Sequence, residues 1–264
     1  MGYFLRKYLM KGGLLLGGVS CTVYTPMQPH APLIRAKGQG EIMGQVQLSL
    51  RPELAAAYSP MPHLLVLGGV SARPRMPRPA GGEGTDFKFE IDNFRTLQYE
   101  VGLGGYWPLA PDWTLQLIGG AGDARVRRHV AEPAIILGGF SADFEARYRK
   151  AFGQLGFNYQ RSREAIGFGY RMTNVVFRQL DMQKTCGDYA FYELPLPNQV
   201  RHELYGFFRQ SIGNPSRQSH WQVQGAGALS MVPRSESILN NGIYVAYTQK
   251  NSLLVSLGLT YLFR

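Results

Sequence analysis

The sequence has no run of about 18 consecutive apolar residues, and this absence excludes membrane-spanning helices on length. Amphipathic helix-forming runs are scarce, and only 17% of the residues are charged, which is typical of neither a disordered chain nor a helical membrane protein. Cysteine is nearly absent, since the chain has only Cys21 and Cys186. Because no metal-ligand spacing surrounds Cys186, we interpret it as a passive thiol in a long loop.

The chain does contain an export signal at its start. Basic residues lie within 6–11, the apolar centre is Leu14–Leu16, and the small residues 17–20 precede Cys21. This is the tripartite form of a secretory signal peptide, so we expect residues 1–20 to be removed. A cysteine directly after the cut offers a thiol for acylation, which predicts a lipoprotein with Cys21 as the lipidated residue. The alternative is an ordinary secretory signal that happens to contain a cysteine.

Apolar and polar residues alternate along much of the remaining chain. The pattern is clear in RTLQYEVGLGGYW (95–107), WTLQLIGGAG (113–122), WQVQGAGALSM (221–231) and LLVSLGLTYLFR (253–264). A period of two is that of a β-strand with one apolar face. Ten strands are expected, at about 40–50, 53–59, 63–73, 94–107, 113–126, 142–160, 165–179, 201–212, 219–231 and 250–263.

The connections between these expected strands alternate in length. Short turns rich in Pro, Gly, Asn, Asp and Ser lie at 59–63, 108–112, 161–164 and 213–217. Longer connections lie at about 74–93, 127–141, 180–201 and 232–250, and only the first hairpin, near Arg51 and Pro52, is short on the loop side. Aromatic residues stand at strand ends beside the short turns: Trp107, Trp113, Tyr261 and Phe263. This arrangement is typical of an outer-membrane barrel.

We therefore predict an all-β chain, a single antiparallel transmembrane β-barrel of about ten strands over residues 40–264, in the cell outer membrane of a Gram-negative bacterium. Two stretches are harder to place. Near RYRKAFG the apolar residues change from even positions, such as Phe144, to odd positions, such as Leu155, which predicts a β-bulge. The strand at 201–212 has apolar residues on both faces, so its register stays open.

The residues after the expected cleavage site resemble a known group. They carry a cysteine, a Tyr-x-Pro, a Pro-Leu and a Lys-Gly before the first strand: Cys21, Tyr24, Pro26, Pro32, Leu33, Lys37 and Gly38. This pattern is similar to that of uncharacterised outer-membrane β-barrel lipoproteins of Bacteroidota. The resemblance implies a fold and a location but no activity. We expect residues 21–39 to be an extended tether, and the lack of acidic residues before Glu41 favours a periplasm-facing N-terminus.

The sequence predicts no catalytic, cofactor-binding or metal-binding residues. The stretches GQGEIMG and GLGG do not join a strand to a helix, as a nucleotide-binding loop does, and their glycines favour close packing in strands. No two of the five histidines have the spacing of a helical metal site. Ser219 and His220 are the one adjacent nucleophile and base, but neighbours on a strand point to opposite faces.

Two basic stretches lie on the expected long-loop rim, RPRMPR at 73–78 and RVRRH at 125–129. They are interpreted either as a patch for acidic lipid headgroups or surface glycans, or as solvated arginines with no ligand. Nucleic acid is excluded as a partner, because export takes the chain away from it. The expected partners are outer-membrane lipid and other envelope proteins.

Polar residues on the expected inner face decide between the functional alternatives. The set is Gln98, Glu100, Gln116, Arg171, Gln222 and Gln224. Because side chains can largely fill the interior of a small barrel, this set predicts a plugged lumen. A plugged lumen favours a structural or accessory role in an envelope assembly. The alternatives are a narrow channel or small-ligand transporter and, less favoured, an outer-membrane enzyme.

Overall fold

The computed structural model describes residues 23–73, 95–132, 140–161, 163–184, 191–193, 196, 198–212, 220–233 and 251–263. The strands of these residues are, in chain order, β1 (Gly40–Gln47), β2 (Arg51–Tyr58), β3 (Leu64–Arg73), β4 (Arg95–Ala110), β5 (Trp113–Glu132), β6 (Phe140–Arg161), β7 (Glu164–Lys184), β8 (Phe191–Glu193), β9 (Asn198–Ser211), β10 (Trp221–Met231) and β11 (Ser252–Phe263). No helix in these ranges is long and apolar enough to cross a membrane.

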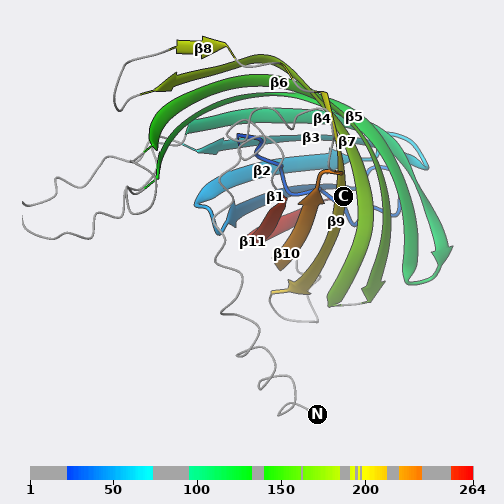
Figure 1. The fold of residues 1–264 in the computed structure, drawn as a ribbon. Helices are drawn as coiled ribbons and strands as arrows, with labels where there is room; N and C mark the ends of the chain where they lie inside the picture. The colour runs from blue at the N-terminus through cyan, green and yellow to red at the C-terminus, as the bar shows by residue number, and fades with distance from the viewer. Residues whose placement is uncertain are drawn as a thin grey trace, which may run out of the picture.

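Antiparallel pairing joins the strands into a closed ring (Figure 1). Neighbours in sequence pair with each other, β7 pairs with β9 past the short β8, and β1 closes the ring against β11, with Gly40 opposite Phe263. In the described part of the chain, ten long strands form the wall and β8 pairs only with the end of β7. The predicted ten-stranded antiparallel barrel is confirmed.

The wall has an apolar outer face and a largely polar inner face. On β11, Leu253, Leu257 and Leu259 are exposed, whereas Ser256 and Thr260, at positions of the opposite parity, are buried. A period of two therefore places apolar side chains outward, as contact with lipid requires. The expected aromatic girdle is present at the short-turn rim, where Trp113 packs on Tyr159, Trp221 packs on Tyr261, and Trp107 is exposed.

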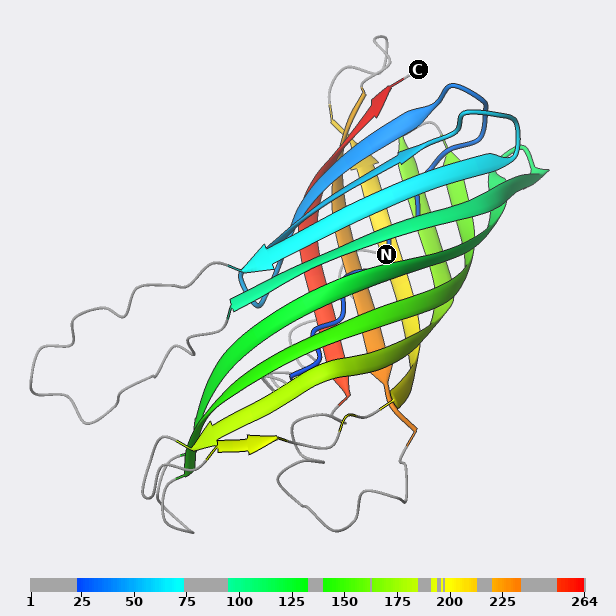
Figure 2. The ribbon, with the colours of Figure 1, turned by 90° about the horizontal axis from the view of Figure 1, so that it is seen from above.

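The wall is uneven in height (Figure 2). β5, β6 and β7 have 20, 22 and 21 residues, whereas β1 and β2 have 8 each. A strand crosses a membrane with about 9 to 11 residues, so β5–β7 extend well beyond the apolar band. They extend at the rim where the connection between β3 and β4 takes residues 74–94, which we call the long-loop end.

The bulge expected in β6 lies on its neighbour instead. The register between β5 and β6 is continuous, but in the β6–β7 ladder Arg147 faces Gln179 while Tyr148 faces Phe177, which leaves Arg178 as the extra residue on β7. Even positions of β6 point inward throughout, including the buried Phe144. The change in apolar parity arises because the lumen itself is apolar toward the long-loop end, so the prediction of a bulge in β6 was wrong.

Candidate functional site

A stretch of chain without regular secondary structure lies inside the barrel. Every residue of 23–34 is buried, and Figures 1 and 2 both show this dark-blue stretch within the ring of strands. We call residues 23–35 the lumen segment. Pro26, Pro29 and Pro32 recur in it at every third position. Proline prevents a helix and has no backbone N–H, so fewer buried donors in this segment need partners.

Tyr24 holds the segment toward the long-loop end. Its ring packs against Tyr148 of β6, with 5.3 Å between ring centroids, and the guanidinium of Arg201 lies 4.1 Å from its ring centre. The backbone N–H of Thr25 donates to the Tyr148 hydroxyl at 3.2 Å. Tyr148 in turn packs on Phe177. The inward aromatic residues of β6 and β7 thus form an apolar socket for the start of the segment.

Residues of β1 and β2 contact the next part of the segment. The backbone N–H of Gln28 donates to the Glu53 carboxylate at 3.4 Å, and Arg51 donates to the carbonyl of Pro26. Glu53 also accepts from Gln45 at 2.7 Å and from Gln47 at 2.8 Å. Every one of these wall side chains is buried, so the contacts form away from bulk water.

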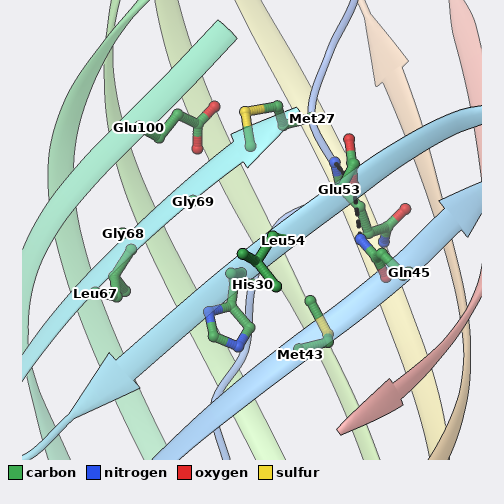
Figure 3. Close-up of a pocket in the computed structure, with 12 residues that line it drawn as sticks. Met27, His30, Met43, Gln45, Glu53, Leu54, Leu67, Gly68, Gly69 and Glu100 are labelled. Carbon is green, nitrogen blue, oxygen red and sulfur yellow. Dashed lines mark hydrogen bonds between the residues drawn. The ribbon is translucent and has the colours of Figure 1, made fainter. Parts of the chain in front are cut away.

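A small cavity remains between the segment and the wall. Its volume of about 20 Å³ fits about one water molecule. Figure 3 shows Met27 and His30 of the segment around it, with Met43 of β1, Glu53 of β2 and Glu100 of β4. A space of this size does not form an open passage.

Glu41 binds the segment most extensively. This carboxylate, on β1, is fully buried, and it lies 2.8 Å from the Nε2 atom of His30. It accepts from the backbone N–H of Leu33 at 2.9 Å and pairs with Arg209 of β9 at 3.0 Å. Arg209 donates a further hydrogen bond to the carbonyl of Ala31 at 3.1 Å. One buried ion pair therefore links two wall strands to three residues of the lumen segment.

Amide side chains of the wall bind carbonyls of the segment. Gln154 of β6 donates to the carbonyl of His30 at 2.9 Å, and Asn158 donates to that of Pro32 at 3.3 Å. At the short-turn rim, Arg35 donates to the carbonyl of Pro111 at 2.7 Å, in the turn between β4 and β5. The segment is thus bound along its whole length, from Tyr24 to Arg35.

A second charged network crosses the lumen between wall strands. Glu100 of β4 lies 2.5 Å from Lys150 of β6 and 2.8 Å from Arg171 of β7. Arg171 also faces Glu203 of β9 at 3.4 Å, and all four side chains are buried. The two cations and two carboxylates of this network neutralise each other. The six polar residues predicted to face the lumen are all buried: Gln98, Glu100, Gln116, Arg171, Gln222 and Gln224.

Several predicted features fall outside the described residues: the signal peptide at 1–20, Cys21, Cys186 and Ser219. His220 is exposed at the short-turn rim near Tyr261. The described part of the expected tether begins at Val23, and its residues 23–34 are buried inside the barrel without regular secondary structure.

The segment begins at Val23 toward the long-loop end and leaves at Arg35 beside the short turns, which face the periplasm in barrels of this class. The start of the segment buries Val23 and Tyr24 in the apolar socket of β6 and β7. Residues 1–22 lie outside the described residues, so the periplasm-facing N-terminus stays a prediction.

Small residues at inward positions of the strands are a sign of the lumen segment in the sequence. Inward positions of several strands carry alanine: Ala55, Ala57, Ala165, Ala226 and Ala228. Small inward residues in a ten-stranded ring leave space for further chain, because eight strands already give an interior that side chains just fill. Ala165, Ala226 and Ala228 form a buried cluster with Ala31 and Leu33 of the segment.

No protein-family model matches the sequence, and no curated protein sequence matches it. Among solved structures, the outer-membrane protease OmpT of Escherichia coli is 12% identical, with a TM-score of 0.51 over 85% of this chain and 93% of that one. The translocator domain of the autotransporter NalP from Neisseria meningitidis is 7% identical, with a TM-score of 0.42 over 98% and 97% of the two chains. The toluene transporter TbuX of Ralstonia pickettii is 12% identical, with a TM-score of 0.39 over 87% and 90%.

At these identities the likeness is one of fold. It agrees with the closed antiparallel ring, the apolar outer face and the aromatic girdle, which together are the features of a barrel that spans an outer membrane. The chain is an outer-membrane β-barrel.

Proposed function

We propose that this chain is a non-conducting outer-membrane barrel with a structural or accessory role in an envelope assembly, without enzymatic activity of its own. The observation that carries the proposal is the lumen segment, which is buried from Val23 to Ile34 and bound by side chains of β1, β2, β6 and β9. A channel needs a continuous water-filled path. Because the lumen segment fills this path, we infer that the protein acts through its outer surface and does not conduct solutes through its interior.

The pairing of charges inside the lumen supports the same proposal. An unpaired buried charge draws water or a counter-ion, because its burial costs several kcal/mol. Glu41 pairs with Arg209, and Glu100 pairs with Lys150 and Arg171. These buried charges therefore find their counter-charges within the protein.

A narrow channel or small-ligand transporter is the second candidate. It is favoured by the polar wall and by the noncovalent character of the contacts to the segment. If the segment left, Glu53, Gln154 and Arg209 would line a hydrated passage, because each now bonds to it. Neither a channel nor a transporter of this kind would require a cofactor.

Conductance in planar bilayers tests the two candidates. The purified chain should show no steady conductance, whereas a variant that lacks residues 23–34 should open stable steps, since the bound segment is removed from the lumen. A Cys21→Ser variant keeps the segment and should stay closed, as a matched control. Stable ion-selective steps from the unaltered chain would favour the channel candidate instead.

The proposal includes an anchor at Cys21. The export signal and the resemblance to Bacteroidota lipoproteins support it. Since a single acyl chain holds a protein only marginally, the barrel supplies the permanent insertion. The lipid would fix the N-terminus at the membrane surface.

A further inference from the structure

Six exposed arginines gather on the outer face of the barrel near the long-loop end. They come from four adjacent strands and are Arg95 of β4, Arg125 and Arg127 of β5, Arg147 and Arg149 of β6, and Arg178 of β7. The ladders place Arg95 opposite Arg127, and Arg125 opposite Arg147. We call this set the arginine patch. Each of these two pairs is close in space, because residues opposite each other in an antiparallel ladder lie about 5 Å apart.

The patch keeps an excess of positive charge. Four carboxylates lie on the same face, those of Asp123, Asp143, Glu145 and Asp181, against six arginines. Glu145 binds Arg125 at 2.8 Å and Arg127 at 2.9 Å. Two guanidinium groups are thereby held in fixed positions by one carboxylate. Six arginines against four carboxylates leave an excess of two positive charges that is available to an anion.

The patch begins directly where the apolar band ends. On β5 the outward residues change from Leu117 and Ala121 to Asp123 and Arg125 along the strand. Outward residues of β4 change in the same way, from Leu97 to Arg95. The acyl chains of the membrane end at this boundary, so the next layer that the protein meets is that of the lipid headgroups.

Within the described residues, the arginine patch occupies one side of the barrel. At the long-loop end of β1, β10 and β11 the outward residues are apolar, as Val46, Leu229 and Leu253 show. A general requirement for solubility above the membrane would place charge around the whole rim. The concentration on β4–β7 indicates a local binding site.

We propose that the arginine patch binds the phosphate groups of a phosphorylated glycolipid, lipid A, in the outer leaflet. The guanidinium group presents several N–H donors in a planar fork that matches phosphate oxygens, and it keeps its charge at all relevant pH values. Because the patch lies at the boundary of the membrane, it favours the phosphate of a lipid over a soluble phosphate. The acyl chains of the bound lipid would then lie on the apolar band next to the patch. This inference concerns the outer face and does not depend on whether the lumen conducts.

Native mass spectrometry of the purified chain tests this proposal with two probes, bisphosphorylated lipid A and its chemically dephosphorylated form. The unaltered chain should retain the phosphorylated lipid about tenfold or more strongly, because clustered basic residues attract anionic headgroups at a membrane surface. Equal retention of the two probes would overturn the proposal without the use of any variant.

Two variants locate the site. Arg125→Gln with Arg147→Gln removes two neighbouring charges of the patch and should reduce retention of phosphorylated lipid A by about tenfold or more. Arg161→Gln removes an exposed arginine at the opposite end of β6 and should leave retention unchanged. Heat-modifiable gel mobility verifies that each variant is folded. Unchanged retention in the folded double variant, or an equal loss in Arg161→Gln, would overturn the assignment.

Discussion

Replacement of Glu41 by glutamine should destabilise the barrel more than any change of an exposed charge. Glu41 is fully buried and bonds to His30, to the backbone N–H of Leu33 and to Arg209. Without the carboxylate, the buried guanidinium of Arg209 loses its counter-charge. Removal of one partner from a buried pair costs about 3–5 kcal/mol, so the free energy of unfolding of Glu41→Gln should fall by that amount.

Denaturant titration of the detergent-refolded chain, followed by tryptophan fluorescence, measures this loss. Glu145→Gln is the control, because Glu145 pairs with half-exposed arginines at the outer face, and such a pair contributes about 0–1 kcal/mol. The double variant Glu41→Gln with Arg209→Gln should recover part of the loss, since no unpaired charge remains. A loss below about 1 kcal/mol in Glu41→Gln would refute the reasoning that this ion pair holds the segment to the wall.

Two further predictions concern packing and the N-terminus. A Cβ at Gly169 would collide with the backbone carbonyl of Leu155 and with the ring of Tyr205, so Gly169→Ala should lower the free energy of unfolding by about 1–3 kcal/mol in the same titration. Gly153→Ala is the control and should cause no such loss, because a Cβ at that position meets no other atom. Equal stability of the two variants would contradict this packing. Cys21→Ser should abolish incorporation of labelled fatty acid while the chain still reaches the outer membrane, and Cys186→Ser should keep the label; unchanged labelling of Cys21→Ser would show that another residue is acylated.

The barrel could be predicted from the sequence because lipid and lumen impose opposite polarity on alternate residues. β11 is the clearest case, with six apolar positions of one parity in LLVSLGLTYLFR. The register of β9 could not be predicted, because two of its apolar residues, Tyr205 and Phe207, point inward. There they pack in one buried cluster with residues of the lumen segment. The local pattern of a strand gives no information about an apolar partner that the lumen contains.

The lumen segment itself could not be located from its own residues. It has no period of two, and several of its partners are far away along the chain: Tyr148 follows Thr25 by 123 residues, and Arg209 follows Ala31 by 178. An extended, proline-rich stretch fits equally well as a linker outside the barrel. Only the contacts with β1, β2, β6 and β9 distinguish the two positions.

Accessibility of single cysteines tests the central claim, which is that the lumen segment fills the barrel. In a background with Cys21→Ser and Cys186→Ser, a cysteine would replace Ala31, which is 2% exposed, or Ala36, which is exposed just beyond the segment. The structure predicts that a water-soluble maleimide labels Ala36→Cys in the folded barrel but labels Ala31→Cys only after denaturation. Equal labelling rates at the two positions in the folded protein would contradict a segment bound inside the lumen.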